Sequence, residues 1–482
     1  MTTNLIYYIA DAIERFKRLL SNSNMEEKQH QISGIEWCLK NEVYLHKGGL
    51  IADEMGLGKT LQMLGVINGN PLSHTLIVVP LALLDQWKIA IQDFLGYSPL
   101  VYHGTNKRKI TMESLAENKY RIVLTTYGQI SVFKNKKNIL HMQKWNRVCF
   151  DEAHHLRNPR TGMHRGAMTL DAPIRWLMTG TPIQNSKRDF YSLCAAIGLE
   201  ASYFTKQSNL MELVKTYIMK RTKKSIGLEL PPLTSEQELL SWDTKEEALL
   251  AEQIHSVLDF SNVRGNKWGN NLTSALGRHK LSMLVRARQC CILPDLMGKQ
   301  VAKLEEEGEL ELDDDAKKGL AGKSKLEQVC SKIIQRKDNK RAKLIFCHYR
   351  REIDFIQQIL KNAGMSVATF DGRTPPKERN HILTSEWDVL ILQIQTGCEG
   401  LNLQQFSEVY FISPHWNPAV EDQAVARCHR IGQTHSINVF RFSMSGFSHT
   451  DDNECSEDSY TLDQYSREKQ EHKREIAREV LG

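Results

Sequence analysis

The sequence lacks the features that mark several large classes of protein. It has no uninterrupted run of about eighteen apolar residues, so it predicts no membrane-spanning helix. Its ten cysteines include no C-x-x-C pair, so neither a structural zinc site nor a disulfide framework is indicated. Unpaired cysteines are typical of a reducing compartment. The first residues lack a basic segment followed by an apolar one, so we expect no signal peptide.

Neither sign of charge is in large excess. The 63 Lys and Arg residues and 57 Asp and Glu residues give a net charge of +6, which permits a polyanionic partner without requiring one. Hydrophobic residues make up 41% of the 482 positions, which is enough for the large cores of two or three domains.

The most informative stretch is residues 48–60, GGLIADEMGLGKT, which has the pattern of a buried strand, a glycine-bearing loop and the start of a helix. Gly56 and Gly58 allow the loop to turn its N–H groups toward a phosphate, and the helix N-terminus attracts the same anion. Lys59 provides a positive charge for the β- and γ-phosphates, and Thr60 provides a hydroxyl for Mg²⁺. The pattern therefore predicts ATP and Mg²⁺ as cofactors.

One position departs from the usual pattern G-x-x-x-x-G-K-[ST]. Asp53 stands where the first glycine is usual, and the alternative interpretation is an ordinary glycine-rich turn before a helix. Upstream, residues 30–39 have the spacing of an amphipathic helix, and Gln31 either recognises adenine through its amide or lies on the surface. The predicted ATP-binding residues are Gln31, Asp53, Glu54, Met55, Gly56, Leu57, Gly58, Lys59 and Thr60.

A second motif follows further along the chain. Residues 147–154 have the pattern of an apolar strand that ends in Asp151 and Glu152. An acidic pair at the end of a strand, in a chain with a phosphate loop, supplies what a Mg²⁺–ATP site needs. We assign Asp151, together with Thr60, to the metal, and Glu152 to deprotonating the attacking water. The alternative is a strand end with solvated charges.

Strands and helices alternate in both halves of the sequence, which predicts parallel sheets with helices on both faces. Ligands bind at the C-terminal ends of the strands in such sheets, and the candidate motifs fall at such ends. The predicted strands are 50–52, 76–80, 100–102, 121–125, 147–152, 175–179, 343–347, 366–370, 388–392 and 409–412.

Together, these motifs resemble those of the Swi/Snf-type ATPases of helicase superfamily two. The aspartate in the first position of DEMGLGKT is that family's own form of the phosphate loop, so the departure at Asp53 supports the resemblance, which covers roughly residues 28–482. The matching stretches include DEMGLGKT (53–60), DEAH (151–154), TGTPIQN (179–185) and a last motif that contains WNP and HRIGQ (416–433).

The resemblance implies an α/β fold of two RecA-like lobes, each a parallel sheet flanked by helices, with helical insertions between them and a C-terminal brace helix. The implied segments are an N-terminal helix and linker (1–27), an ATP-binding lobe (28–232), a helical insertion with an acidic linker (233–322), a second lobe (323–445), and a polar linker with the brace helix (446–482).

The resemblance also implies roles that composition and spacing do not reveal. Arg427 and Arg430 resemble the arginine fingers that reach the γ-phosphate from the second lobe. Spaced i, i+3 on one helix, they are expected to project to one side, with Gln423 one turn earlier. The alternative is a solvated basic face. The residues expected to couple the motifs are His154, Thr179, Gly180, Thr181, Gly400 and Gln423.

The partner that the resemblance implies is double-stranded DNA, bound without sequence preference. A DNA-bound protein is the expected target of remodelling, in the nucleus, or in the host nucleus if the chain is similar to the compact global transactivators of large viruses. The lack of paired cysteines excludes the zinc module that some relatives carry between the lobes. The predicted DNA contacts, for which strand-end capping is the alternative, are Pro80, Thr125, Thr126, Thr396 and Gly397.

Three functions remain open from the sequence. The first is a DNA-dependent ATPase that translocates on duplex DNA and remodels protein–DNA complexes, in chromatin remodelling or transcription regulation. The second is a strand-separating DNA or RNA helicase, which the forms DEMGLGKT and HRIGQ disfavour. The third is a non-enzymatic regulator, which the presence of Lys59, Asp151 and Glu152 disfavours.

Two polar segments are not explained by an ATP-driven enzyme. Residues 305–315 hold eight carboxylates. We interpret this segment as a solvated linker between the lobes or, alternatively, as a tethered polyanion that competes with DNA for the cleft that the two lobes are expected to form. Residues 446–459 are polar throughout, and we predict no regular structure there.

Overall fold

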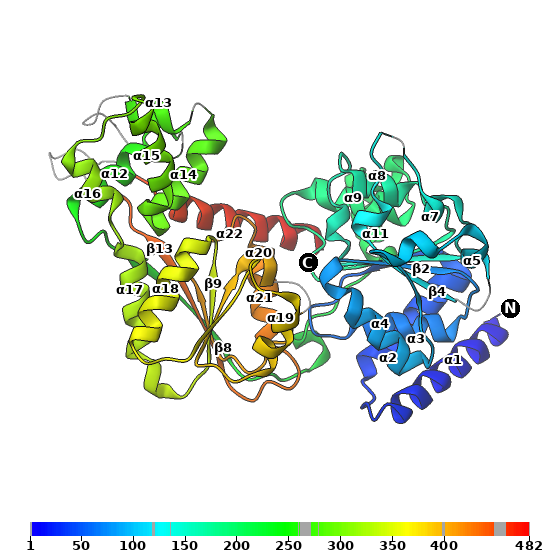
Figure 1. Cartoon of the computed structure of the whole chain (residues 1–482). Coiled ribbons are helices and arrows are strands. Elements are labelled where there is room, and N and C mark those ends of the chain that lie inside the picture. Colours follow the sequence, from blue (N-terminus) through cyan, green and yellow to red (C-terminus); the bar gives the residue numbers. More distant parts are fainter. Residues whose placement is uncertain are drawn as a thin grey trace. The chain divides into compact units, whose positions relative to one another are not determined.

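The computed structural model divides the chain into two compact units, each built around its own sheet (Figure 1). The first unit contains Met1–Glu229 and Lys473–Gly482, and the second contains Leu230–His472. The structure describes residues 2–117, 121–134, 136–258, 260, 271–277, 279–397, 401–447 and 459–481.

The sheet of the first unit has seven parallel strands in the order β3-β4-β2-β5-β6-β1-β7. Most of its strands are continuous runs of buried residues, as expected where helices cover both faces of a parallel sheet. Because the strands run in one direction, the loops that follow them all emerge on one side of the sheet, at the C-terminal ends of the strands. The strands are β1 (Gly48–Ile51), β2 (Thr75–Val79), β3 (Leu100–Tyr102), β4 (Ile122–Thr126), β5 (Arg147–Asp151), β6 (Ile174–Met178) and β7 (Ile218–Met219).

Helices cover both faces of this sheet, because successive strand residues point to opposite sides. Ile51 packs with the helices on one face, and Leu50 packs with those on the other. Val480 of the C-terminal helix α22 (Leu462–Leu481) belongs to the same hydrophobic cluster as Leu50. The first group is α1 (Thr2–Asn22), α2 (Gln29–Lys40), α3 (Lys59–Gly69) and α4 (Leu84–Leu95); the second is α5 (Met112–Ala116), α6 (Tyr127–Ile130), α7 (Ile139–Met142), α8 (Gly162–Met168), α9 (Lys187–Ile197), α10 (Ala201–Phe204) and α11 (Leu210–Tyr217).

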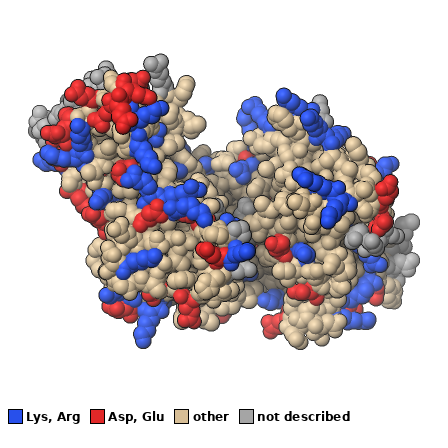
Figure 2. Space-filling view, in the orientation of Figure 1, with Lys and Arg blue, Asp and Glu red and all other residues tan. Residues whose placement is uncertain are grey.

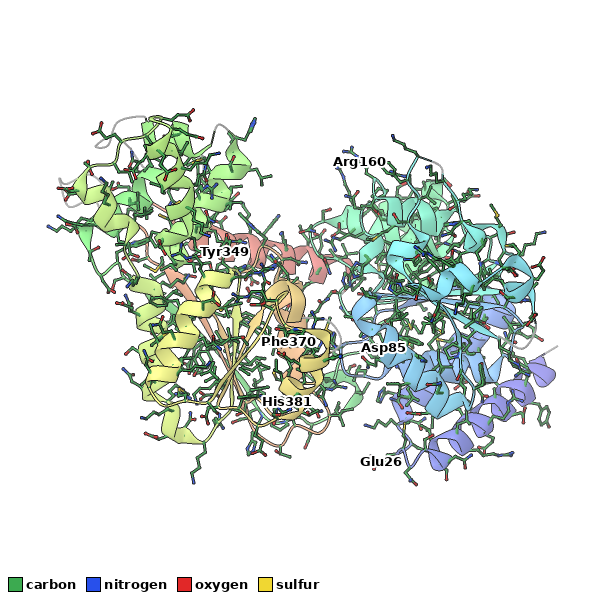
Figure 3. The ribbon with its side chains drawn as sticks, viewed as in Figure 1. Glu26, Asp85, Arg160, Tyr349, Phe370 and His381 are labelled. Atoms are coloured by element: carbon green, nitrogen blue, oxygen red, sulfur yellow. The ribbon has the colours of Figure 1, made fainter. Side chains whose placement is uncertain are left out.

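The second unit has a six-stranded parallel sheet in the order β10-β11-β9-β12-β13-β8. The Phe370 side chain is buried inside the second unit (Figure 3). In the first unit, by contrast, the side chains of Asp85 and Arg160 are exposed on the surface. The strands are β8 (Leu233–Leu240), β9 (Lys343–Cys347), β10 (Val367–Phe370), β11 (Val389–Gln393), β12 (Glu408–Phe411) and β13 (Ile437–Met444).

The helices of the second unit also form two groups. One shares a hydrophobic cluster with Ile345 and the other with Leu344, neighbouring residues on opposite faces of β9. Within the described ranges, no helix combines the length and apolar character needed to cross a membrane. The first group is α12 (Lys245–His255), α13 (Asn271–Leu276), α14 (Lys280–Ile292), α15 (Gly298–Glu306), α16 (Asp314–Leu320), α17 (Ser324–Gln335) and α18 (Arg350–Asn362); the second is α19 (Pro376–Thr384), α20 (Ile394–Gly397) and α21 (Pro418–Cys428).

The predicted fold class, two parallel sheets flanked by helices with a helix at the C-terminus, is confirmed. Three strands were not predicted, β7 in the first sheet and β8 and β13 in the second. β8 is largely exposed and polar because it lies at the sheet edge, where main-chain pairing with β13 along eight residues holds it in place. Such a strand has no run of apolar residues by which to recognise it.

The acidic run at 305–315 is not the extended linker that its composition indicates. It consists of the end of α15, a turn and the start of α16, where Asp313 accepts a hydrogen bond of 2.8 Å from the N–H of Ala316. Leu310 and Leu312, which alternate with the carboxylates, are buried in the core. Acidic side chains gather over this part of the second unit (Figure 2). They lie on a folded surface, so the tethered-polyanion hypothesis loses its premise.

The first turn of α22 is held in the second unit by a buried ion pair. Asp463 and Lys325 are each 2% exposed or less, and the Lys325 ammonium contacts the carboxylate directly. The hydroxyl of Ser413 and the N–H of Met444 donate to the same carboxylate. Burial acts to raise the pKa of Asp463, but the Lys325 charge and these donors outweigh it and lower the pKa below its ordinary value.

This pair predicts the cost of removing one partner. Lys325→Met leaves the Asp463 carboxylate buried without its cation, and we expect the free energy of unfolding of the second unit to fall by about 3–5 kcal/mol. The double variant Lys325→Met/Asp463→Leu removes both charges and is expected to recover most of that loss. Because the folded pKa of Asp463 is lowered, its stabilisation in the wild type is present above about pH 4 and is lost as the pH falls further. Urea denaturation at several pH values measures both effects; equal losses in the single and double variants would contradict the prediction.

Candidate nucleotide-binding site

The glycine-bearing loop between β1 and α3 has the backbone shape that its glycines predict. Gly56 and Gly58 have φ of 90° and 79°, in the left-handed region that favours glycine. A Cβ atom on Gly58 would lie 2.4 Å from Nε2 of Gln31, so no larger residue fits there. Gly58 is also the N-cap of α3, which begins at Lys59, so the N–H groups of the first turn of the helix follow directly.

The Lys59 side chain lies over this loop. Its ammonium donates to the main-chain oxygen of Asp53 at 2.7 Å and to that of Glu54 at 3.3 Å. Phosphate oxygens are stronger partners for an ammonium than peptide carbonyls are. The glycine cradle, the helix start and this ammonium therefore fit a phosphate group.

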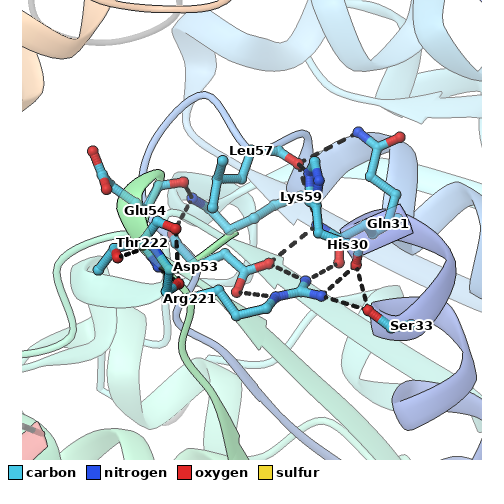
Figure 4. Close-up of polar contacts among 11 residues, drawn as sticks. His30, Gln31, Ser33, Asp53, Glu54, Leu57, Lys59, Arg221 and Thr222 are labelled. Atoms are coloured by element: carbon cyan, nitrogen blue, oxygen red, sulfur yellow. Dashed lines mark hydrogen bonds and ion pairs between the residues drawn. The ribbon is translucent and has the colours of Figure 1, made fainter. Parts of the chain in front are cut away.

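The helix before the loop packs against it through its first residues (Figure 4). Nε2 of Gln31 donates to the Leu57 oxygen at 3.4 Å, and Nε2 of His30 lies 3.0 Å from the same oxygen. Gln31 is 4% exposed. The structure thus places Gln31 beside the loop, and its contact with adenine stays a prediction.

Asp151 is the last residue of β5 and Glu152 follows it, at the C-terminal ends of the strands, where the loop after β1 also emerges. The Asp151 carboxylate accepts a hydrogen bond of 2.7 Å from Nε1 of Trp87 and one of 2.9 Å from the N–H of Glu152. The hydroxyl of Tyr127 donates to the Asp151 main-chain oxygen at 2.6 Å. These contacts fix the orientation of the carboxylate that we assign to the metal.

Burial raises the pKa of Asp151 to about 6, and the neighbouring Glu152 charge contributes in the same direction. The Trp87 hydrogen bond opposes this increase because it stabilises the ionised form. Asp151 therefore ionises closer to neutral pH than an ordinary aspartate does.

Glu152 connects this strand end with the next one. Its φ is 46°, an uncommon value for a residue with a side chain. Nδ1 of His154 lies 3.4 Å from Oε2 of Glu152 and 3.2 Å from the hydroxyl of Thr179, and that hydroxyl accepts from the N–H of Thr181 at 3.2 Å. A Cβ on Gly180 would lie 2.8 Å from Met55, so this segment also approaches the phosphate loop closely.

The structure adds residues that sequence reasoning missed. Trp87 comes from α4, and nothing in its local pattern distinguishes it from an ordinary core residue. Lys223 donates its N–H to Glu54 at 2.8 Å and places its ammonium 3.2 Å from the same carboxylate. Arg221 contacts the carboxylate of Asp53. The sequence did contain one signal for such a partner. Asp53 places a charge at a position usually occupied by glycine, and a charge there calls for a cation nearby.

The predicted DNA contacts in the first unit have buried side chains. Pro80 is buried, and the Thr125 hydroxyl donates to the Tyr102 oxygen at 2.8 Å. The Thr126 hydroxyl lies 3.4 Å from Nδ1 of His103, and Thr126 is 4% exposed. These side chains are engaged within the first unit, and their predicted contact with a DNA backbone stays a prediction.

The remaining predicted site residues lie in the second unit. Thr396 and Gly397 end α20, and their side chains are outside what the structure describes; Gly400 lies outside the described residues altogether. Gln423 is buried on α21, one turn before Arg427. Their predicted roles stay predictions.

The placement of the two arginines on one helix face was wrong. α21 ends at Cys428, so Arg427 lies in its last turn and Arg430 in the turn that follows. His429 caps the helix with a non-helical backbone (φ −89°, ψ 77°), and the side-chain amide of Gln433 donates to the Cys428 oxygen at 3.2 Å. The two side chains are still neighbours: burial lowers the pKa of Arg430, and the positive charge of Arg427 lowers it further.

Comparison with known families agrees with this geometry. The model of the SNF2-related domain matches residues 30–296, more than half of the chain, and the model of the helicase conserved C-terminal domain matches residues 324–432. The probable global transactivator of Orgyia pseudotsugata multicapsid polyhedrosis virus is 27% identical over 86% of this chain and 85% of its own length. The ATP-dependent DNA helicase DDM1 of Arabidopsis thaliana is 26% identical over 86% of this chain and 58% of its own length.

Other relatives are much longer than the matched region. The DNA excision repair protein ERCC-6-like of Danio rerio is 25% identical over 86% of this chain, which spans 34% of that protein. The solved Sulfolobus solfataricus SWI2/SNF2 ATPase core in complex with dsDNA is 24% identical and aligns with 88% of this chain and 89% of its own, with a TM-score of 0.40.

The contact between Trp87 and Asp151 leads to a pH prediction. Trp87→Phe removes a hydrogen-bond donor from the ionised carboxylate, so the pKa of Asp151 should rise above its value of about 6 by about one unit. Because the protonated group cannot hold a cation, the lower pH limit of Mg²⁺-dependent ATP hydrolysis should move upward by a similar amount.

Rates measured from pH 5.5 to 8.5 at limiting Mg²⁺ test this expectation. Trp145→Phe is the matched control, because the buried indole of Trp145 donates at 2.8 Å to the main-chain oxygen of Leu140 and not to a carboxylate. An equal loss of rate at every pH in Trp87→Phe would show that the contact does not tune Asp151.

Proposed function

The chain belongs to the SNF2-related family and has its two-domain ATPase core, and from this premise we propose that it hydrolyses ATP to move along double-stranded DNA. The observation that carries the proposal is the convergence of two strand ends in the first unit. The loop after β1 presents Lys59, and the end of β5 presents Asp151 and Glu152, at one edge of one parallel sheet.

Each of these residues has a chemical role that its surroundings support. Bound Mg²⁺–ATP supplies the phosphoryl group that is transferred to water. Lys59 and the glycine loop would hold the phosphates, the Thr60 hydroxyl and the Asp151 carboxylate would hold the cation, and Glu152 would accept a proton from water. A series of contacts through His154, Thr179 and Thr181 links Glu152 to the segment after β6. A change at the Glu152 carboxylate can therefore alter that segment.

We propose the finer role on narrower support. The named relatives include a probable global transactivator of a virus and an ATP-dependent DNA helicase. The name global transactivator fits the remodelling of protein–DNA complexes in transcription regulation. We place this activity in a nucleus or host nucleus. Strand separation fits the second name and is the rival that the experiment must distinguish. The net charge of +6 is compatible with a DNA partner in both cases.

Duplex DNA of unrelated sequences should stimulate ATP hydrolysis to a similar extent. Added salt should raise the DNA concentration needed for half-maximal stimulation, because each phosphate contact releases a counterion. The measurement is steady-state ATPase activity with duplex DNA, single-stranded DNA and RNA at two salt concentrations, alongside a strand-displacement assay. Glu152→Gln, which should bind ATP without hydrolysing it, is the negative control. Equal stimulation by RNA, or efficient strand displacement, would favour the helicase alternative; no hydrolysis at all would favour a non-enzymatic regulator.

Arg427 and Arg430 are proposed to stabilise the charge that develops on the γ-phosphate during hydrolysis. Replacing either with alanine should then lower kcat by about 10³-fold or more and leave the dissociation constant of ATP nearly unchanged. Single-turnover hydrolysis and equilibrium ATP binding separate the two quantities. If either variant weakened binding while hydrolysing its bound ATP at the normal rate, that arginine would belong to ground-state binding instead.

A further inference from the structure

The first position of the phosphate loop is occupied by a fully buried carboxylate. The Asp53 side chain is 0% exposed and lies in the loop that the proposed function assigns to an anionic nucleotide. A buried carboxylate is costly unless a cation and hydrogen-bond donors surround it. A carboxylate beside a polyphosphate carries the further cost of repulsion between like charges. The loop therefore needs a compensating cation.

Arg221 supplies that cation through a two-pronged contact (Figure 4). Its Nε donates to Oδ1 of Asp53 at 3.0 Å, and its Nη2 contacts Oδ2. Nε2 of Gln62, on α3, donates to Oδ2 at 3.2 Å. A planar guanidinium matches a carboxylate in this way, and the pairing leaves the Asp53 charge neutralised within the protein interior.

The same guanidinium reaches the two helices that flank the loop. It contacts the main-chain oxygen of His30 and lies 3.3 Å from the hydroxyl of Ser33, both on α2. It also donates to Oε1 of Gln62 on α3 at 2.7 Å. A Cβ on Gly34 would lie 2.2 Å from Oε1 of Gln62 and 2.8 Å from Nη2 of Arg221, so a larger residue there would displace these side chains. One side chain thus joins the helix before the loop, the loop itself and the helix after it.

The backbone places Arg221 at this point. β7 pairs with β1, and the pairing continues alongside the loop, where the N–H of Ala52 donates to Met219 at 2.7 Å and the N–H of Glu54 donates to Arg221 at 2.8 Å. Arg221 is therefore held beside the loop by main-chain hydrogen bonds as well as by its side chain.

We propose that Arg221 is a positioning residue for the nucleotide, whose charge makes the Asp53-containing loop able to accept a polyphosphate. The inference rests on the proposed binding of ATP by this loop. The role of Arg221 is electrostatic, because the charge balance of the Asp53–Arg221 pair, more than its two-pronged geometry, sets the affinity for the nucleotide.

Four variants test this charge balance by equilibrium binding of ATP. Arg221→Met should raise the dissociation constant at least tenfold, which corresponds to about 1.4 kcal/mol. Arg221→Lys keeps the charge without the fork and should stay within about threefold of the wild type. Asp53→Asn leaves the cation in place without its carboxylate and should bind ATP at least as tightly as the wild type. Asp53→Asn/Arg221→Met should return to within about threefold of the wild type, because neither charge remains.

A further readout separates positioning from catalysis and from general stability. In Arg221→Met the KM for ATP should rise while kcat at saturating ATP stays within about threefold. The matched control is Arg147→Met, which breaks another buried contact between an arginine and a carboxylate, that with Glu42, at the start of β5. This control should unfold more readily than the wild type but bind ATP with an unchanged dissociation constant.

The outcomes distinguish the inference from the function on which it rests. If the wild type binds no ATP, the proposed function fails. If the wild type binds ATP and Arg221→Met binds it equally well, or if the double variant is as weak as Arg221→Met, the electrostatic role is overturned. Should Arg221→Met not fold, Asp53→Asn still decides, because binding more than threefold weaker than that of the wild type contradicts the charge balance.

Discussion

The pairing of buried charge is the constraint on which both units depend. In the first unit, Asp53 is held by Arg221 in the phosphate loop, and Glu42 is held by Arg147 at the opposite edge of the sheet. In the second unit, the pair of Lys325 and Asp463 anchors the start of the C-terminal helix. A charge removed from water must find a partner inside the protein, often far along the sequence. These pairs therefore fix which segments meet, with a specificity that apolar packing alone does not provide.

The sequence predicts most of this architecture because parallel strands covered on both faces are continuous apolar runs. The bounds of β9, Lys343–Cys347, agree with those predicted, and the predicted C-terminal helix is present at Leu462–Leu481. β8 was missed because an edge strand can be polar when main-chain pairing holds it. The acidic run was misinterpreted because two buried leucines lie among its carboxylates, and their burial depends on helices distant in the sequence. The composition of the segment is dominated by its exposed carboxylates, whereas its structure is determined by these two buried leucines.

The candidate site divides in the same way. Lys59, Asp151 and Glu152 belong to short motifs whose spacing reflects local chemistry, so they were assigned from the sequence. Trp87 and Arg221 act on those motifs from distant positions, and no local pattern connects Asp53 with a residue 168 positions later. Arg430 was placed on a helix because its spacing from Arg427 permits it. The helix instead ends at Cys428, where the backbone of His429 leaves the helical conformation. Geometry that depends on tertiary contacts is what the sequence left open.

The pair of Asp53 and Arg221 also constrains the order in which its members can be exchanged during evolution. A loop with glycine at the first position carries no buried charge, so an arginine at position 221 can arise beforehand and find main-chain and amide oxygens as partners. Aspartate arising first would be buried without a cation, at a cost of about 3–5 kcal/mol, a large share of the stability of a typical domain. The accessible route therefore runs through arginine first and aspartate second. Once both are present, loss of the arginine first would leave the aspartate buried without its cation, so we expect the two positions to change together.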